Sequence, residues 1–371
     1  MNTVKSLYIH FPFCETKCHY CDFYSLGRER TRDGDADRFE LALHAESILA
    51  APQLGPSIDT LFFGGGTPSM TPPESMSRAI APLKLKERLA PDYEWTMEAN
   101  PSSVDTERLR QYREIGVNRV SMGVQAMRDD LLLRLGRVHS REKAIFALES
   151  IFAAGYTNVS VDLLYGVPGQ NLDDLKSAMA ALTAFPITHL SCYLLTLPPH
   201  HRMYKELPNE DTQLEHLQCI HDEMTGRGFE HYEISNYAKP GHRARHNLAY
   251  WKGLSYLGLG PSAHSFDATE GKRWKNISSL HQYARVLEEG KLPVEWSETL
   301  TDDQKHLERW MLALRLSEGF PETWLQKPHQ MLRAKALAQE GLIERHPEDV
   351  SRLRLTSRGF AVSESIIQAL S

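Results

Sequence analysis

Short runs of apolar, β-branched and aromatic residues alternate with longer amphipathic stretches through the first two hundred residues of the chain. The short runs predict strands, and they lie at residues 7–10, 60–63, 94–98, 119–123, 159–163 and 189–194. The longer stretches predict helices, of which the clearest span residues 38–50, 105–114, 142–153 and 172–182. This alternation favours a parallel sheet with helices packed outside it, so we expect an α/β fold.

The residues that follow the predicted strands indicate how the sheet is arranged. Cysteines follow the first strand, a glycine run at 64–66 the second, Asn100 and Pro101 the third, Gln125 the fourth, and the stretch 166–169 the fifth. Polar or glycine-rich residues at the carboxyl ends of successive strands are typical of the active face of a (β/α) barrel. Because only six units are present, we predict a partial (β/α)6 barrel over residues 1–235.

The rhythm changes beyond residue 205, which predicts further parts of the chain. Residues 228–266 are rich in tyrosine, histidine and glycine and are expected to form loops and short strands within an extension at 236–300. A helical pattern returns at residue 301, with an apolar stripe at 310–316. Stretches at 337–344, 353–356 and 359–370 then suggest helix, turn, strand and helix. We therefore predict a smaller α+β C-terminal module at 301–371 that resembles a winged helix.

Charge and hydropathy exclude some classes of protein. The 42 basic and 48 acidic residues give a net charge of −6, so the chain lacks the basic excess of a protein that binds nucleic acid by bulk electrostatics. No window approaches the roughly 18 uninterrupted apolar residues of a membrane span, and no signal-peptide pattern opens the sequence. We expect a cytoplasmic protein without a membrane span.

Three of the five cysteines gather in one short segment. Cys14, Cys18 and Cys21 have the spacing C-x3-C-x2-C, which is typical of metal ligation in a reducing compartment rather than of a disulfide framework. Three thiolates can hold three corners of a four-iron cube and leave the fourth iron open to a small molecule. Zinc is an alternative if His10 or His19 supplies a fourth ligand. A redox disulfide between Cys18 and Cys21, or three purely structural cysteines, are further alternatives.

A glycine run follows the second predicted strand. Its sequence, Gly-Gly-Gly-Thr-Pro at 64–68, allows a ligand to approach the backbone because no Cβ stands in the way. The run matches neither the phosphate-binding loop nor the dinucleotide fingerprint, because the lysine and the spacing of those motifs are missing. A tight turn between strand and helix is the alternative interpretation.

Taken together, these motifs resemble the radical S-adenosylmethionine (SAM) superfamily, and most closely its branch of HemW heme chaperones and oxygen-independent coproporphyrinogen III oxidases. The resemblance runs through most of the chain. It rests on the segments at residues 8–14, 63–69, 98–101, 123–125, 135–139 and 162–170, together with the cysteine triplet, Tyr20 and Asp22.

The resemblance implies roles for residues at matching positions. Cys14, Cys18 and Cys21 would hold three irons of a 4Fe-4S cluster, and the fourth iron would bind SAM. The positions that match contacts to this SAM are Tyr8, Gly65 and Glu98. The positions that match the surroundings of a second SAM in the coproporphyrinogen enzymes are Tyr20, Gly66, Thr67, Gln125, Arg137 and Asp162. The side-chain types suit these roles, because Arg137 can pair with a carboxylate while Glu98 and Asp162 can accept from an ammonium or ribose hydroxyls.

The resemblance also implies a chemistry. An electron donor would reduce the cluster, and the electron would cleave SAM into methionine and a 5′-deoxyadenosyl radical. The task of the protein would be to hold the cofactors and exclude water and oxygen.

Two features favour the chaperone branch over the oxidases. The oxidases carry a further cysteine two residues after the third, and this chain has Phe23 there. An H-N-x-x-Y-W motif that is associated with heme binding in the HemW branch begins at His246. His246 could ligate heme iron, Tyr250 and Trp251 offer apolar faces to a porphyrin, and Arg243 could pair with propionates.

We therefore expect a radical SAM protein that binds heme and transfers it to an acceptor protein, which could itself be membrane-associated. Coproporphyrinogen III oxidation is the enzymatic alternative, and Phe23 weighs against it. A barrel that is stabilised by zinc and only scaffolds other proteins is a third possibility.

Overall fold

The computed structural model of the protein describes residues 4–371, and contacts between Cα atoms divide the chain into two compact units. The first unit contains the described residues up to Leu163 together with Phe185–Thr188 and Leu254–Thr299. The second contains Leu164–Ala184, His189–Gly253 and Leu300–Ser371. Each unit is thus assembled from distant segments of sequence, and the three-part division at residues 235 and 300 stays a prediction.

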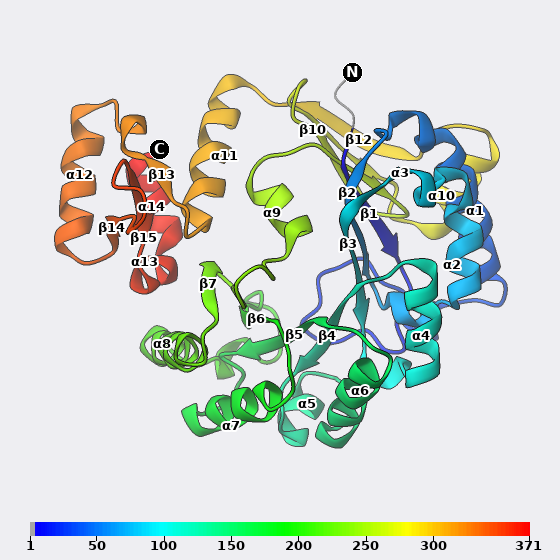
Figure 1. Ribbon diagram of the computed structural model, residues 1–371, viewed down its shortest axis with the longest axis horizontal. Coiled ribbons are helices and arrows are strands. Elements are labelled where there is room, and N and C mark those ends of the chain that lie inside the picture. The colour runs from blue at the N-terminus through cyan, green and yellow to red at the C-terminus, as the bar shows by residue number, and fades with distance from the viewer. Residues whose placement is uncertain (1–3) are drawn as a thin grey trace. The chain divides into compact units, whose positions relative to one another are not determined.

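The first unit is built around a mostly parallel sheet. Its strands are β1 (Ser6–Phe11), β2 (Ile58–Gly65), β3 (Leu89–Ala99), β4 (Arg119–Gln125), β5 (Asn158–Tyr165), β9 (Tyr256–Leu259), β10 (His264–Asp267), β11 (Lys272–Asn276) and β12 (Val294–Thr299). Strands β1 to β5 pair in parallel and in chain order, side by side in Figure 1. Strand β9 pairs in parallel with the outer side of β1, and β10, β11 and β12 continue from it as antiparallel strands.

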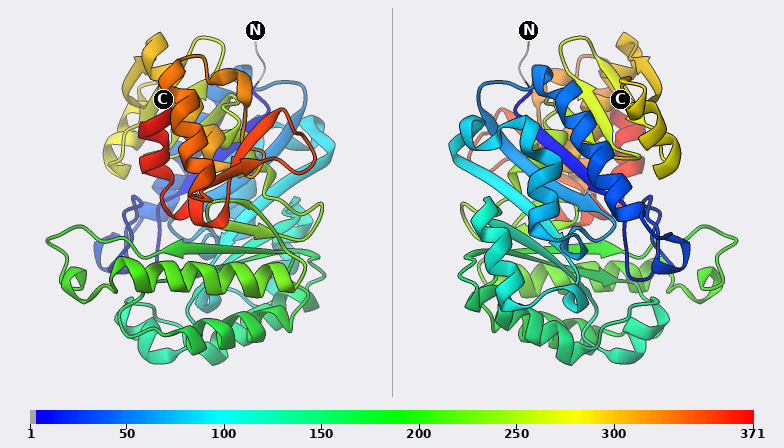
Figure 2. Two further views of the ribbon diagram at one scale, coloured as in Figure 1. Left: turned by 90° about the vertical axis from the view of Figure 1, so that its left-hand side faces the viewer. Right: turned by 90° about the vertical axis from the view of Figure 1, so that its right-hand side faces the viewer.

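Helices cover this sheet. They are α1 (Asp35–Ala50), α2 (Pro73–Ile80), α3 (Leu85–Arg88), α4 (Thr106–Ile115), α5 (Asp129–Arg134), α6 (Arg141–Ala153) and α10 (Leu280–Glu288). Helices α1, α2, α4 and α6 contact one another in turn, and the right-hand view of Figure 2 faces α1 and α2. Strand β1 is buried along nearly its whole length, because parallel strands covered by helices need apolar residues on both faces.

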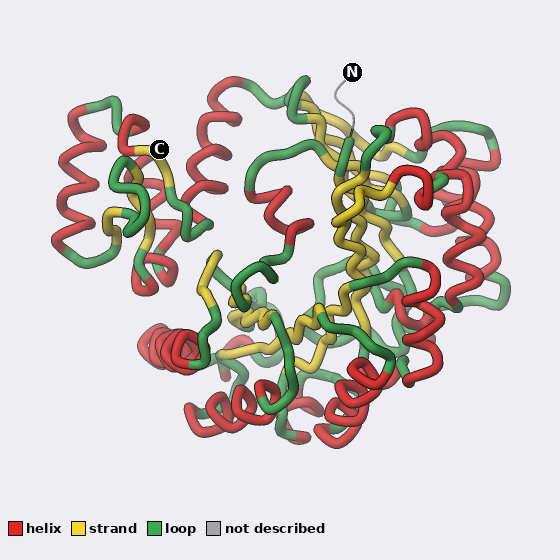
Figure 3. Tube along the Cα trace, viewed as in Figure 1, coloured by secondary structure: helices red, strands yellow, loops and turns green. Residues whose placement is uncertain are grey.

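The second unit contains two small antiparallel sheets among helices. Its helices are α7 (Leu172–Thr183), α8 (Glu210–Gly226), α9 (Arg245–Trp251), α11 (Asp302–Arg315), α12 (Pro328–Gln339), α13 (Ser357–Ala361) and α14 (Ser363–Leu370). Its strands are β6 (His189–Leu194), β7 (Glu230–Glu233), β8 (Asn236–Ala238), β13 (Phe320–Pro321), β14 (Ile343–Arg345) and β15 (Arg352–Leu355). Strand β8 pairs with both β6 and β7, while β15 pairs with both β13 and β14 (Figure 3). Trp310, Phe320 and Leu370 belong to the apolar core of the C-terminal module.

The predicted α/β class and the α+β C-terminal module are confirmed, and two details of the predicted elements are wrong. The stretch 337–344 is not one helix, since α12 ends at Gln339 and β14 begins at Ile343. Gly341 separates them with a φ of +70°, a backbone conformation in which glycine commonly terminates helices. Helix α9 was also missed, and it carries the H-N-x-x-Y-W motif that we had expected in a region of loops and short strands. Among residues 4–371, no helix is both long and apolar enough to cross a membrane.

Candidate cofactor site

The three predicted ligand cysteines lie in the loop that follows β1. Backbone hydrogen bonds fold this loop, because Cys14 N donates to Leu26 O over 2.9 Å and Cys21 N donates to Cys18 O over 3.2 Å. A third bond, from His19 N to Leu135 O, ties the loop to the end of α5. All three cysteines are half-buried free thiols, so the structure does not contain the Cys18–Cys21 disulfide considered above.

Two donors from other parts of the first unit reach the cysteine sulfurs. Thr67 Oγ1 donates to Cys14 Sγ over 3.5 Å, and Arg137 Nη1 donates to Cys18 Sγ over 3.5 Å. Burial raises the pKa of the Cys14 and Cys21 thiols, so both keep their protons until a metal displaces them. Hydrogen bonds to the sulfurs favour the thiolate that metal binding requires. This donor set fits an iron–sulfur cluster.

The geometry around the loop does not favour a mononuclear ion. Among residues 4–371, no three His, Cys, Asp or Glu side chains lie close enough to hold one metal ion. His10, considered above as a zinc ligand, has both ring nitrogens occupied, with Nδ1 3.1 Å from Tyr8 Oη and Nε2 2.8 Å from Tyr24 O. In a four-iron cube each cysteine binds a different iron, so this criterion for single ions does not apply to the cluster.

The glycine run brings the end of β2 against the cysteine loop. Gly65 has a φ of +108°, and a Cβ there would lie 2.5 Å from the His10 ring. A Cβ on Gly66 would lie 2.6 Å from Phe13 O, because Gly66 N donates to Phe11 O over 2.7 Å. These glycines therefore permit close packing of protein on protein at their Cβ positions, whereas we had expected them to leave room for a ligand.

A pair of carboxyl groups lies beside the glycine run. Gly65 N donates to Glu98 Oε2 over 3.1 Å, and Ser121 Oγ donates to Asp162 over 3.3 Å. Burial, with the negative charge of Asp162 as the second cause, raises the pKa of Glu98 to about 8. Tyr8 lies on the neighbouring strand β1 and donates its hydroxyl proton to His10 Nδ1, because His10 Nε2–H must donate to the Tyr24 carbonyl. A ligand with a cationic or hydroxyl donor group would suit these acceptors.

Gln125 and Arg137 meet next to β4. Arg137 Nη2 donates to Gly123 O over 2.6 Å, and a Cβ on Gly123 would approach Gln125 Nε2 at 3.0 Å. Gln125 has a φ of +69°, a strained conformation for a residue with a side chain. Burial raises the pKa of Tyr20, and the nearby charge of Arg137 opposes that shift. The structure thus brings together three of the residues predicted to surround a second ligand.

Sequence reasoning did not assign a role to His139, which is buried next to this group. Its Nε2 donates to Val124 O over 3.1 Å, and burial together with the charge of Arg137 lowers its pKa to about 4. The only signal in the sequence is its position two residues after Arg137. The neutral ring fixes the backbone of β4 immediately before the strained Gln125.

The H-N-x-x-Y-W residues belong to the second unit, where helix α9 places His246 and Tyr250 one turn apart. His246 is 1% exposed, and its Nε2 lies 2.7 Å from Tyr250 Oη. The Arg315 guanidinium stacks 4.1 Å from the Trp251 ring. Among the described residues, the buried Trp251 Nε1 has no hydrogen-bond partner.

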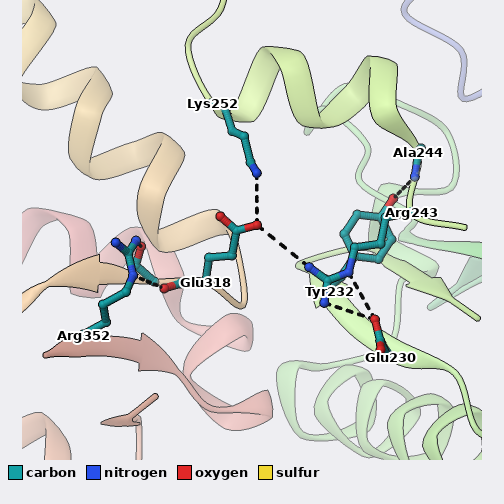
Figure 4. A network of polar contacts seen from close by, with 8 residues as sticks. Glu230, Tyr232, Arg243, Ala244, Lys252, Glu318 and Arg352 are labelled. Atoms are coloured by element: carbon teal, nitrogen blue, oxygen red, sulfur yellow. Dashed lines mark hydrogen bonds and ion pairs between the residues drawn. The ribbon is translucent and has the colours of Figure 1, made fainter. Parts of the chain in front are cut away.

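Arg243, considered above for heme propionates, already contacts two carboxylates (Figure 4). Its Nη2 lies 3.1 Å from Glu230 Oε2, and its Nη1 lies 3.9 Å from Glu318 Oε1. Lys252 also contacts Glu318, at 3.1 Å, while Arg352 Nε donates to the Glu318 carbonyl over 2.8 Å. A propionate would have to compete with Glu230 for Arg243.

Comparison with known proteins identifies the family. The Radical SAM superfamily model matches residues 8–182. The chain is 35% identical to the heme chaperone HemW of Mycobacterium tuberculosis, over 98% of this chain and 94% of that protein. The chain belongs to the HemW family. A second HemW, from Bacillus subtilis, is 32% identical over 99% of both chains. HemW membership confirms the resemblance to the radical SAM superfamily on which the site residues were chosen.

The fold is shared with a solved relative of the HemW family. The structure of coproporphyrinogen III oxidase (HemN) from Escherichia coli, described as a radical SAM enzyme, superposes with a TM-score of 0.82. It covers 99% of this chain and 90% of that chain at 23% sequence identity. At this identity the likeness concerns the architecture alone, and it supports the predicted partial radical SAM barrel.

Proposed function

We propose that this protein is a heme chaperone that binds heme and passes it to an acceptor protein. The observation that carries the proposal is the similarity, over nearly the whole chain, to proteins named heme chaperone HemW. Besides the two relatives above, the HemW of Escherichia coli is 33% identical over 85% of this chain and 84% of that protein. The similarity to the M. tuberculosis and B. subtilis proteins covers 98% and 99% of the chain, so it takes in most of both units.

Phe23 supports a chaperone rather than a porphyrinogen oxidase. Its side chain is 67% exposed, and it stands where the resemblance gives the oxidases a further cysteine. A phenyl ring can neither ligate iron nor transfer a proton. When coproporphyrinogen III, SAM and a reductant are supplied together under anaerobic conditions, we expect no protoporphyrinogen to form. Turnover in that assay would overturn the proposal in favour of the oxidase.

We propose that Cys14, Cys18 and Cys21 hold a 4Fe-4S cluster. When bound and reduced, the cluster supplies the electron that cleaves SAM, so the protein needs an electron donor as a partner. Thr67 and Arg137 would donate hydrogen bonds to cysteine sulfurs, as they do to the free thiols. Iron and sulfide analysis of anaerobically prepared protein should give four of each per chain. Zinc in their place would support the scaffold alternative.

We propose that SAM is bound on the side of the cluster where Tyr8, Gly65 and Glu98 lie. Glu98, with its raised pKa, would bind the ammonium or ribose of SAM and lose its proton as the positive charge approaches. Tyr8 is held by His10, so its ring is oriented before the ligand arrives. The second group, which comprises Tyr20, Gly66, Thr67, Gln125, Arg137 and Asp162, would surround a further ligand.

We propose that His246 is the axial ligand of the heme iron. Its Nε2 is engaged by Tyr250, so ligation would exchange that hydrogen bond for a bond to iron. Trp251 Nε1, a buried donor without a partner among residues 4–371, could then bond a polar edge of the porphyrin.

The heme site can be tested by titration of heme into the protein, followed at the Soret band. His246→Ala should weaken heme binding, whereas His329→Ala, an exposed histidine on α12, should not. Tyr250→Phe removes the competing hydrogen bond and should leave binding intact or strengthen it. An unchanged titration of the His246 variant would place the ligand elsewhere, with His242 the next residue to test.

A further inference from the structure

Two histidines of the second unit face one another across a turn, far in sequence from the cysteines. His221 lies on α8 and His231 on β7, and their Nδ1 atoms are 3.2 Å apart. Both line a cavity of about 430 Å³ that is mostly polar, together with Glu230, Arg243 and Thr225. Neither histidine belongs to the residues assigned above to the cluster, SAM or heme.

The surroundings of His231 fix which nitrogen carries a lone pair. Its Nε2 is 3.2 Å from the Ile234 carbonyl oxygen, which can only accept, so Nε2 carries the proton. Burial lowers the pKa of His231 to about 4 and lowers that of His221 as well, so both rings are neutral at pH 7. The Nδ1 of His231 therefore presents a lone pair to His221. A carbonyl that accepts from the far nitrogen is the arrangement by which proteins orient a histidine for metal binding.

Packing holds the His231 ring in this orientation. The ring stacks on Tyr237 at 4.2 Å between centroids with an interplanar angle of 13°. Phe360 covers it at 5.0 Å with its ring tilted. His221 is half-buried on α8, and its ring can approach or recede by side-chain rotation alone. The site thus has one fixed imidazole and one adjustable one.

We propose that His221 and His231 bind a divalent transition-metal ion of the Zn²⁺ class through their two Nδ1 atoms. With bonds of about 2.05 Å to each nitrogen, the observed separation gives an angle at the metal of about 100°, close to tetrahedral. The proton on His221 Nδ1 moves to its Nε2, so no net charge is lost. No third protein ligand lies near enough among residues 4–371, and water from the cavity completes the coordination.

The charged groups of the cavity neither attract nor repel such an ion strongly. Glu230 is paired with Arg243, and Glu344 is paired with Arg354 at 2.7 Å, so positive and negative charges balance on its walls. Affinity therefore comes from the two imidazoles, which prefer zinc, copper and nickel to magnesium and calcium. The alternative is a plain hydrogen bond between two neutral imidazoles.

Calorimetric titration of Zn²⁺ into the tag-free protein, with its cysteines occupied by the reconstituted cluster, tests the proposal. We expect one zinc per chain in the wild type and binding at least about tenfold weaker in His231→Phe, which keeps an aromatic ring against Tyr237. His221→Phe should show the same loss, and it changes only a half-buried side chain if the other variant does not fold. His329→Phe, exposed on α12, is the matched control and should bind as the wild type does.

X-ray absorption at the zinc edge separates this site from the cysteines. Scattering from two imidazoles without a zinc–sulfur distance supports the proposal, and a zinc–sulfur shell overturns it. Equal affinity in the wild type and both phenylalanine variants, or no zinc binding beyond that of a buffer control, would also overturn it and leave the pair as a hydrogen bond.

Discussion

Replacing Gly65 with alanine should damage the first unit more than its single added methyl group suggests. The backbone at Gly65 has a φ of +108°, and an L-residue held there costs about 1–2 kcal/mol. The new Cβ would lie 2.5 Å from the His10 ring, so the ring must move. Its hydrogen bonds to Tyr8 and Tyr24 would weaken or break, at about 0.5–1.5 kcal/mol each. We therefore expect Gly65→Ala to lower the free energy of unfolding by about 2–5 kcal/mol.

A matched variant isolates the contribution of the clash. Gly290 also has a positive φ, +72°, but a Cβ there would meet nothing within 4 Å. Gly290→Ala should therefore cost only the backbone strain of about 1–2 kcal/mol. Urea unfolding of both variants in the cluster-free protein, followed by tryptophan fluorescence, gives the two free energies. Equal losses would refute the reasoning, because they would mean that His10 yields to the methyl group at no cost.

Two further predictions concern a buried carboxyl group and the cysteine loop. Burial raises the pKa of Glu46 to about 7 from about 4.5, so the folded state holds this proton more tightly than the unfolded chain. The stability it contributes is present below pH 4.5 and is lost as pH rises through 7, by at most roughly 3 kcal/mol, so Glu46→Gln should flatten the fall in unfolding free energy between pH 5 and 8. An unchanged slope would contradict this assignment. Arg137→Lys should lower the iron retained after a chelator challenge, because one ammonium cannot bond both Cys18 Sγ and Gly123 O as the guanidinium does. Arg141→Lys, exposed on α6, is its control, and equal retention would argue against a role for Arg137 at the sulfur.

Much of the fold could be predicted because its strands are buried on both faces. Strands β1 and β5 appear in the sequence as continuous apolar runs, and each predicted strand from residue 7 to residue 194 is present. Helix α9 escaped prediction because Arg245–Trp251 is short, and its sequence resembles the surrounding loops. The helix predicted at 337–344 was too long at its carboxyl end, because Gly341 in a left-handed conformation was not recognised as its stop.

The site could be predicted in its residues but not in its contacts. Cys14, Cys18 and Cys21 were identified by spacing alone, since thiolates at that spacing imply a metal. The hydrogen bond from Arg137 to Cys18 joins residues 119 positions apart, and no local pattern reveals it. The strain at Gln125 depends on how β4 ends against β5, where the register shifts between Gly123 and Gln125. The occupation of Arg243 by Glu230 and Glu318 likewise depends on the tertiary fold.

Transfer of heme tests the central proposal most directly. The protein, loaded with one heme per chain under anaerobic conditions, is mixed with a heme-free b-type cytochrome, and the Soret band of the acceptor is followed in time. We predict that the acceptor fills faster than it does from the same amount of heme on serum albumin, and that His246→Ala abolishes this advantage. Filling at the rate of the albumin control, with wild type and variant alike, would contradict the assignment of this protein as a heme chaperone.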